Sequence, residues 1–159
     1  MKTQRDIWMI AENIYRCDKN SGEILSTYNA DFFNHLWSFA NILLEDKQGG
    51  FWIGMESRGL IYLDIKNDAD KNSPSKWITK QRKIIKDKTI TALTDSDTGI
   101  IWAGTIYRDL DSAKTYTELY KINQAGDILG RYPIAQRLLR NGNETDLFIN
   151  KIYVDKNND

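Results

Sequence analysis

Short runs of alternating apolar and polar residues recur along the chain, and turn-forming glycine, asparagine and aspartate separate them. Clear runs are ILSTY (24–28), LIYLD (60–64) and ELYKIN (118–123). Aromatic and β-branched residues in runs of this length, bounded by such turn signals, are typical of short β-strands. No helical pattern of comparable length occurs, although RYPIAQRLLRNGNETDL (131–147) has room for one short helix. The pattern therefore predicts an all-β protein.

The strand pattern repeats along the chain. The stretch FANILLEDKQGGFWIGMESRGLIYLD (39–64) is echoed by ITALTDSDTGIIWAGT (90–105), which continues after an insertion as ELYKINQAGDILGRY (118–132). DIWMIAENIYRCDKNSGEILSTY (6–28) enters the same pattern partway, and FINKIYVDKNND (148–159) repeats its beginning. The spacing of the anchoring tryptophans is at or slightly above that of four-stranded blade repeats. These residues, 44 and 50 positions apart, are Trp8, Trp52 and Trp102.

Each copy reads as four short strands. The first strand leads into an acidic turn, the second carries the tryptophan, the third alternates, and the fourth is expected at 24–28, 76–80 and 128–132. Four-stranded antiparallel meanders with tryptophan and glycine at fixed offsets stack radially in a β-propeller. We expect the tryptophans to fill the space between neighbouring sheets, and Gly54 and Gly104 to permit close backbone approach. A β-sandwich is the competing fold, but it gives no reason for Trp-x-Gly to recur at blade intervals.

We therefore predict an all-β fold, a β-propeller fragment of about three four-stranded antiparallel blades. The expected parts are an incomplete first blade without its innermost strand and a connection (1–38), a second blade (39–89), a third blade with an insertion (90–147), and the first strand of a following blade (148–159). Three blades cannot close a ring, since propellers typically have about four to eight. The chain is then either a piece of a longer one, which we favour, or it associates with another copy that completes the split blade. Its partner is accordingly the remainder of the propeller or a second copy, and two copies would supply six blades.

The charge balance limits the classes of partner. The 22 basic residues offset 22 acidic ones, so no long-range field favours nucleic acid or an anionic membrane. Cys17 is the only cysteine, which excludes an intrachain disulfide and a cysteine-based zinc site. The N-terminus lacks a signal-peptide pattern, and no stretch approaches the roughly 18 apolar residues of a membrane helix. We expect a soluble segment without direct membrane contact.

Candidate catalytic and metal-binding residues are few. His35 is the only histidine, and its aromatic surroundings, DFFNHLWSF (31–39), favour packing or surface exposure over a Ser-His-Asp system. The acidic turns DSDTG (95–99) and DKNND (155–159) resemble the first half of a calcium loop but lack the glutamate that completes it. Aspartate and asparagine in such turns ordinarily bond their own backbone, so we expect hairpin turns. The prediction is a segment without enzymatic activity, cofactor or metal.

A ligand site is expected on one rim of the propeller. Loops that join strands two and three lie on the same rim as the connections between blades, and the insertion after Thr105 enlarges one of them. Aromatic faces stack on sugar rings, and Arg–Asp pairs bind hydroxyl groups, so an oligosaccharide is the expected ligand. For any single residue the simpler alternative is a packed aromatic ring or a solvated charge. Residues in the insertion are favoured: Tyr107 and Arg108. The full candidate set is Glu56, Arg58, Tyr107, Arg108, Asp109 and Trp37.

The second copy resembles the two-component regulator propeller repeat, in which an aspartate turn, a Trp-Ile-Gly-Thr strand and a tyrosine-rich strand follow one another. The 90–105 copy keeps the tryptophan and glycines but has Ser96 at the usual aspartate, and the first copy has Ala11 where glycine is usual. The resemblance covers most of the chain. The matching residues of the second copy are Ile42, Asp46, Gly49, Trp52, Ile53, Gly54, Gly59, Leu60 and Tyr62, with Met55 in place of threonine.

The resemblance implies a part of the extracytoplasmic sensor region of a hybrid two-component histidine kinase. Such receptors are best known in Bacteroides-type gut bacteria, where they detect breakdown products of polysaccharides. A periplasmic location, a carbohydrate-derived ligand and no kinase activity in this segment are the corresponding expectations. Two alternatives stay open: a scaffold propeller for protein interaction or dimerisation, and a streptogramin-lyase-like propeller enzyme, which would need a histidine-centred site.

Overall fold

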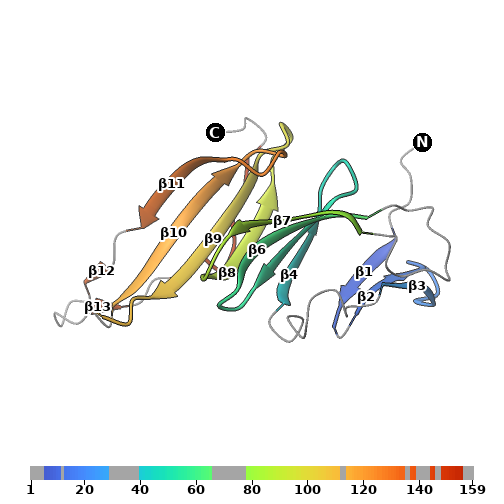
Figure 1. Cartoon of the computed structure of the whole chain (residues 1–159), viewed down its shortest axis with the longest axis horizontal. Helices are drawn as coiled ribbons and strands as arrows, with labels where there is room; N and C mark the ends of the chain where they lie inside the picture. The colour runs from blue at the N-terminus through green and yellow to red at the C-terminus, as the bar shows by residue number, and fades with distance from the viewer. Residues whose placement is uncertain are drawn as a thin grey trace.

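The computed structural model describes residues 6–11, 13–28, 40–65, 78–111, 114–134, 137–138, 144–145 and 148–155. These residues are all-β and contain no helix: eleven strands form three antiparallel sheets, and two further strands pair as a short hairpin. Each sheet is a meander of consecutive strands, and the three sheets follow one another along the molecule (Figure 1). The arrangement confirms the predicted propeller-like fragment of three blades.

The first sheet has three strands, in the order β1 (Ile7–Ile10), β2 (Ile14–Cys17) and β3 (Ile24–Tyr28). Asp18 shapes the turn between β2 and β3, because its Oδ1 accepts two backbone N–H groups of the turn, each at 2.8 Å. Aspartate commonly fixes tight turns in this way. The tryptophan-bearing strand β1 lies at the edge of this sheet, whereas the tryptophan-bearing strands of the other two sheets are interior. Within the described residues the first blade thus lacks its innermost strand, as predicted.

The second sheet has four strands: β4 (Ala40–Glu45), β5 (Phe51–Met55), β6 (Gly59–Ile65) and β7 (Ile78–Ile85). All five residues of β5 are buried, because this strand has sheets on both of its faces. The fourth strand was expected at 76–80; it begins no later than Ile78 within the described residues and continues to Ile85.

A buried aspartate organises the turn between β4 and β5. Asp46 Oδ1 accepts the N–H groups of Gln48 and Gly50, each at 2.9 Å, and Oδ2 accepts the indole N–H of Trp52 at 3.0 Å. The carboxylate therefore joins the turn to the tryptophan at the centre of the blade. In the third sheet Ser96 takes this place, and its Oγ accepts one backbone N–H at 3.0 Å.

The third sheet has four strands: β8 (Thr89–Asp95), β9 (Ile101–Arg108), β10 (Thr115–Ile122) and β11 (Ile128–Ile134). The predicted insertion after Thr105 lengthens the hairpin of its two central strands. β9 has 8 residues, whereas the equivalent β5 has 5. The tip of the third blade consequently reaches beyond the second blade.

The sequence left room for a short helix within 131–147, and this prediction is wrong for the residues that the structure describes. The first four residues of this stretch complete β11 and pair with β10, which satisfies the backbone groups that face β10. Pro133 is tolerated there because β11 is an edge strand. Further on, β12 (Arg137–Leu138) pairs with β13 (Glu144–Thr145).

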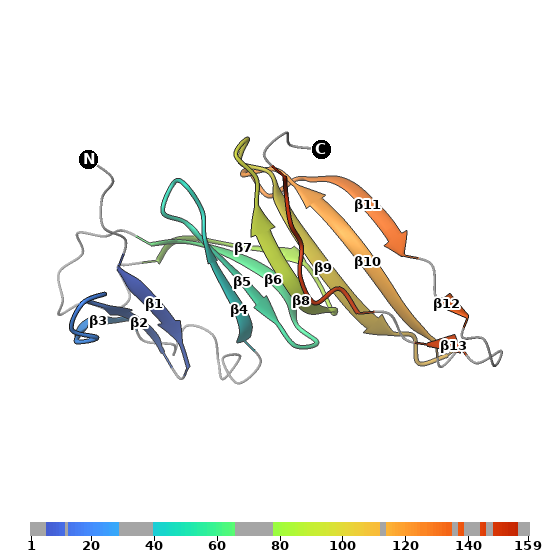
Figure 2. The same ribbon diagram turned by 180° about the vertical axis from the view of Figure 1, so that it is seen from behind.

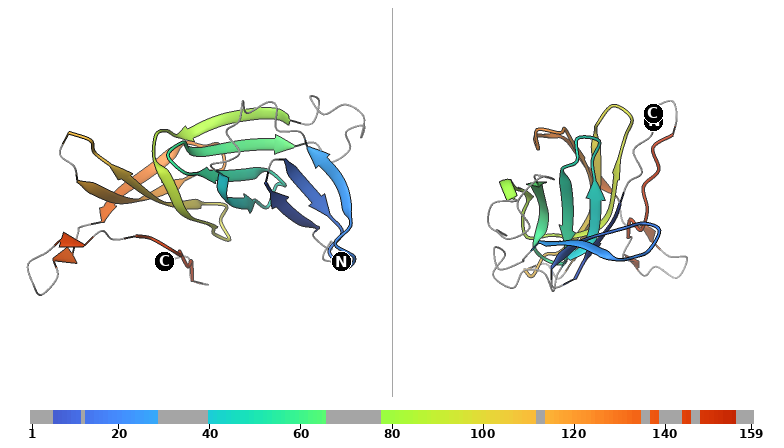
Figure 3. Two further views of the ribbon diagram at one scale, coloured as in Figure 1. Left: turned by 90° about the horizontal axis from the view of Figure 1, so that it is seen from below. Right: turned by 90° about the vertical axis from the view of Figure 1, so that its right-hand side faces the viewer.

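Glycine allows a sheet and the chain beside it to approach closely at two equivalent points. A Cβ atom on Gly54 would lie 2.7 Å from Cγ2 of Ile90 in the third sheet. A Cβ atom on Gly104 would lie 2.9 Å from Cβ of Ile149, in the segment 148–155. Figure 2 shows this segment, in dark red, beside β8 and β9, and Figure 3 shows the three sheets as separate layers. Both glycines thus have the predicted role of permitting close approach.

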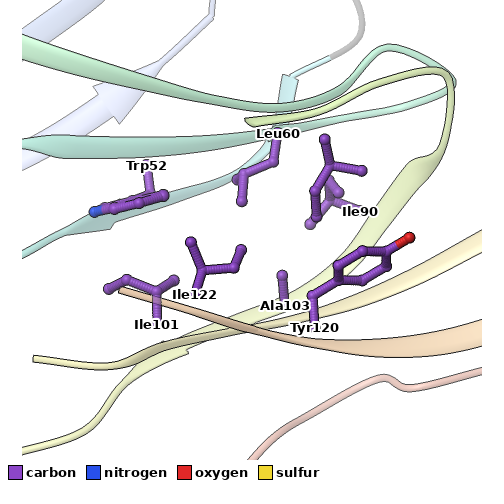
Figure 4. Packing of buried hydrophobic residues seen from close by; sticks show 8 residues of the cluster. Trp52, Leu60, Ile90, Ile101, Ala103, Tyr120 and Ile122 are labelled. Carbon is purple, nitrogen blue, oxygen red and sulfur yellow. The ribbon is translucent and has the colours of Figure 1, made fainter. Parts of the chain in front are cut away.

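Two apolar cores fill the spaces between neighbouring sheets. Between the first and second sheets, Trp8 packs against Phe51 with ring centroids 4.5 Å apart. Between the second and third sheets, Trp52 is fully buried and faces Ile101 and Ile122 (Figure 4). Burying large aromatic and branched side chains supplies most of the stability of such interfaces. The prediction that the tryptophans fill the spaces between sheets is confirmed by both cores.

The strand register corrects one detail of the first repeat. The glycine of Trp-x-Gly stands two residues after the tryptophan, and Gly54 pairs with Leu60 on the next strand. The equivalent residue of the first sheet is Ile10, which pairs with Ile14. Ala11 lies beyond the end of β1, so its assignment to the glycine position was wrong by one residue. Ile10 instead packs into the core between the first and second sheets.

Candidate functional site

The turn between β5 and β6 is fixed against the loop that leads into β8. Ser57, which has a φ of 54°, donates its backbone N–H to Thr89 Oγ1 at 2.9 Å. Gly59 donates its N–H to the carbonyl oxygen of Lys88 at 2.7 Å, and its φ of 89° is a conformation that favours glycine. The two bonds hold the rim turn of the second sheet, residues 56–58, beside the start of the third sheet.

Lys88 points from this loop toward the third sheet. Its ammonium group lies 3.5 Å from the ring centroid of Tyr107 and 2.5 Å from Oε2 of Glu118. The lysine side chain is only 14% exposed, so both the cation–π contact and the ion pair are largely shielded from water. Burial lowers the pKa of Lys88, and the bond to Glu118 offsets part of that effect.

Two tyrosines form an aromatic pair where the third blade projects beyond the second. Tyr107 and Tyr116 are directly opposite each other on β9 and β10, and their rings stack with centroids 5.2 Å apart and planes 19° from parallel. Counted from the tryptophan of each blade, the pair formed by Thr105 and Glu118 is equivalent to the last pair of the β5–β6 hairpin. The two tyrosines come after this pair, so they lie beyond the part of the third sheet that the second sheet covers. Tyr116 is 38% exposed and is therefore accessible from solvent.

Glu118 is a buried carboxylate surrounded by donors. Besides Lys88, the Tyr120 hydroxyl donates to it at 3.0 Å, and Arg131 donates through both Nε, at 2.8 Å, and a terminal nitrogen. Charge-assisted bonds of this kind are stronger than neutral ones, and the two-nitrogen arginine contact also fixes geometry. We call Lys88, Tyr107, Tyr116, Glu118 and Arg131 the rim cluster.

The surroundings of Glu118 shift the pKa values of the groups that meet there. Burial alone raises the pKa of Glu118, but the bonds from Arg131, Lys88 and Tyr120 outweigh it, so the net shift is below the usual value. Burial and donation to the carboxylate raise the pKa of Tyr120 to about 12. At neutral pH the rim cluster therefore combines one carboxylate with two cations.

The structure brings part of the predicted site together. Glu56 and Arg58 are exposed on the two sides of Ser57 in the rim turn. The turn contacts the backbone of Lys88, whose side chain contacts Tyr107. Lys88 thus connects the candidates of the 56–58 turn in the second blade with Tyr107 in the third blade. The sequence predicted that these residues share a rim but not that they lie close together.

Other predicted residues do not join the rim cluster. Arg108 is exposed, and because neighbouring strand residues point to opposite faces, it lies on the other face of β9 from Tyr107. Asp109 shapes the loop after β9, since its Oδ1 accepts the N–H of Asp111 at 2.9 Å. Trp37 and His35 lie outside the described residues.

Sequence reasoning missed four members of the rim cluster: Lys88, Tyr116, Glu118 and Arg131. One signal was available, because TYTELY (115–120) places tyrosine, glutamate and tyrosine at every second position, on one face of a strand. A glutamate within that face has to find cationic partners when it is buried. The partners themselves depend on the register of β9 and β10 and on the contact between the second and third sheets, which the sequence does not specify.

The acidic turn at 95–99 forms a hairpin in which Asp97 Oδ1 accepts a bond from Lys47 Nζ at 2.8 Å. Among the residues described, no group of three or more histidine, cysteine, aspartate or glutamate side chains could hold a metal ion. The described part of the chain also contains no helix of the length and apolarity needed to cross a membrane.

Comparison with known proteins gives no relative. No family model, no curated protein and no solved structure matches the chain.

Proposed function

We propose that the chain is a non-catalytic, ligand-binding segment of a sensor propeller in a two-component receptor, and that its ligand is derived from a carbohydrate. The binding surface would consist of the rim cluster and the neighbouring 56–58 turn. The observation that carries the proposal is the stacked pair of Tyr107 and Tyr116, which projects beyond the second blade beside a turn with charged side chains.

The tyrosine pair supports a sugar as ligand because its outer ring is both accessible and rigid. Tyr107 already contacts Lys88 and Tyr116, so the more exposed Tyr116 offers the surface for stacking. The C–H face of a sugar ring packs against such an aromatic face, and a tyrosine loses little conformational entropy when it is bound. Glu56 and Arg58, exposed on the adjacent turn, can bond to hydroxyl groups of the same ligand.

The ionisable groups of the rim cluster support binding rather than catalysis. A general acid or base needs a pKa near the working pH and a free position for the substrate proton. Glu118 instead accepts bonds from three side chains, and its pKa is lowered rather than raised toward neutrality. Lys88 is held by that carboxylate and by an aromatic ring. Such an arrangement stiffens the surface under the tyrosines.

An oligosaccharide-binding experiment tests the proposal. The whole chain is screened on an array of neutral and uronic-acid oligosaccharides, and hits are measured by calorimetry. Tyr116→Ala should weaken binding by about tenfold or more, the usual effect of removing an aromatic anchor. Leu110→Ala, at a residue 89% exposed in the turn that follows β9, serves as control and should bind like the wild type. Absence of any saccharide binding, or equal affinity of Tyr116→Ala, would refute the proposed function.

A further inference from the structure

The outer face of the first sheet exposes apolar side chains that are buried in the other sheets. Ile7 and Met9 lie on the face of β1 that points away from the second sheet, and they are 46% and 45% exposed. The strand register places their equivalents on β5 and β9, where each is no more than 1% exposed. These equivalents are Phe51 and Ile53 in β5, and Ile101 and Ala103 in β9.

In the second and third sheets, the equivalent face is covered by the tryptophan-bearing face of the preceding sheet. Trp8 of the first sheet packs on Phe51, and Trp52 of the second sheet packs on Ile101. Trp102 of the third sheet is the next in the series. It is only partly buried and lines a groove of about 230 Å³. The two ends of the fragment thus carry the two halves of one recurring interface.

The groove beside Trp102 also contains a strand-like segment that belongs to no sheet. Residues 148–155 run along the third sheet (Figure 2), and Ile149 meets Gly104 as Ile90 meets Gly54. Ile90 belongs to the innermost strand of its blade, so residues 148–155 occupy the position of an innermost strand. Tyr153, on this segment, lines the groove and is 79% exposed.

The first sheet, as far as the structure describes it, has no strand at this innermost position. Its edge strand β1 carries the tryptophan and corresponds to β5 and β9, which pair with inner strands β4 and β8. A strand at a sheet edge, such as β1, is a template for pairing with another strand, and residues 148–155 lie where the other blades have their innermost strand. Apolar burial and backbone pairing would therefore be satisfied by the same partner.

We propose that a second copy of this chain docks head to tail, with its first sheet on the 148–155 segment and the Trp102 groove of the first copy. β1 of one copy would pair with residues 148–155 of the other, and Ile7 and Met9 would cover the groove. The contact continues the interfaces between the first and second and between the second and third sheets. Two copies joined twice in this way would give six blades, within the range of closed propellers. The inference does not depend on the ligand proposed above.

Two variants distinguish this interface, which joins two different faces, from one in which the same face of each copy meets. Met9→Asp damages the first-sheet face, and Tyr153→Asp damages the groove. In the closed pair each variant alone weakens both contacts, so its self-association should fall by about tenfold or more. An equimolar mixture of the two variants retains one fully intact contact, between the groove of the first and the β1 face of the second. The mixture should therefore form mixed dimers more readily than either variant forms its own.

Light scattering over a concentration series and native mass spectrometry provide the readout, with far-UV circular dichroism to show that each variant is folded. We expect the wild type to form dimers, each substitution alone to weaken them, and mixing of the two variants to restore them. The control Leu110→Asp should form dimers of the same mass as the wild type. A folded wild-type monomer at all concentrations would overturn the proposal and leave a further blade of a longer chain as the occupant. A dimer insensitive to both substitutions, or one not restored by mixing, would overturn it as well.

Discussion

Asp46 is predicted to hold the second blade together through its bonds to the turn and to Trp52. The carboxylate is buried and accepts N–H groups of Gln48 and Gly50 and the indole N–H of Trp52. Asp46→Ala would leave two of these donors, those of Gly50 and Trp52, buried without a partner. Each such group costs about 1–3 kcal/mol, so the free energy of unfolding should fall by roughly 2–6 kcal/mol.

A serine at the same position divides this effect into two parts. The third blade has Ser96 there, and its single oxygen still accepts a backbone N–H of the turn. Asp46→Ser should therefore keep the bond to Gly50 but lose the bond to Trp52, at a cost of about 1–3 kcal/mol. The order of stability expected is wild type, then serine, then alanine.

Urea unfolding followed by far-UV circular dichroism measures these differences, because it does not rely on tryptophan emission. Trp52→Phe removes the indole donor, and in that background Asp46→Ser should cost about 1–3 kcal/mol less than in the wild type. Equal losses for the serine and alanine variants would refute the role assigned to the turn bond. An unchanged cost of Asp46→Ser in the phenylalanine background would refute the role assigned to the indole bond.

Three further predictions concern Tyr120, its partner Glu118, and the interface between the second and third sheets. The pKa of Tyr120 is raised from 10.0 to about 12, so the stability that Tyr120 contributes is present below about pH 10 and lost as the pH rises toward 12. Urea unfolding at pH 9 and at pH 11 should therefore show a smaller drop in the free energy of unfolding between these two pH values for Tyr120→Phe than for the wild type. Glu118→Gln leaves Lys88 buried without its carboxylate and should reduce the free energy of unfolding by about 3–5 kcal/mol. Because the pKa of Glu118 is lowered, the wild-type advantage over this variant should persist above its unfolded pKa and disappear as the pH falls through the lower folded one. Gly54→Ala places a methyl group against Ile90 and should cost about 1–3 kcal/mol in the same assay, and an unaltered midpoint would contradict the close packing described.

The blade pattern was predictable because each blade repeats the same local signals. Turn residues such as Asp46 and Asp18, alternating strands and the recurring tryptophan all act within one repeat, where sequence distance and spatial distance agree. The same local reasoning was wrong where pairing decides the outcome. The stretch at 131–147 has residues compatible with a helix, but pairing with β10 determines the conformation of its first four residues.

The candidate site was less predictable, because its residues come from two blades. Tyr107 could be found from the insertion that contains it, whereas Tyr116 is its neighbour only through the register of β9 and β10. Lys88 and Glu118 meet only because the β7–β8 loop lies against the third sheet. Contacts of this kind depend on how sheets pack, and single-sequence patterns do not encode that geometry.

The difference in length between neighbouring blades explains why the rim cluster exists at all. Alternate residues of β9 face the second blade, and this row begins with Ile101 and Ala103 in the buried core. The row continues through Thr105, which is opposite the last covered pair, to Tyr107, where the shorter β5–β6 hairpin has ended. One strand face therefore changes from core to solvent-facing surface within seven residues. A side chain at the uncovered end lacks the partner that a blade of equal length would supply, and Lys88 and Tyr116 contact Tyr107 there instead; under the proposed function, this uncovered end is where the ligand binds.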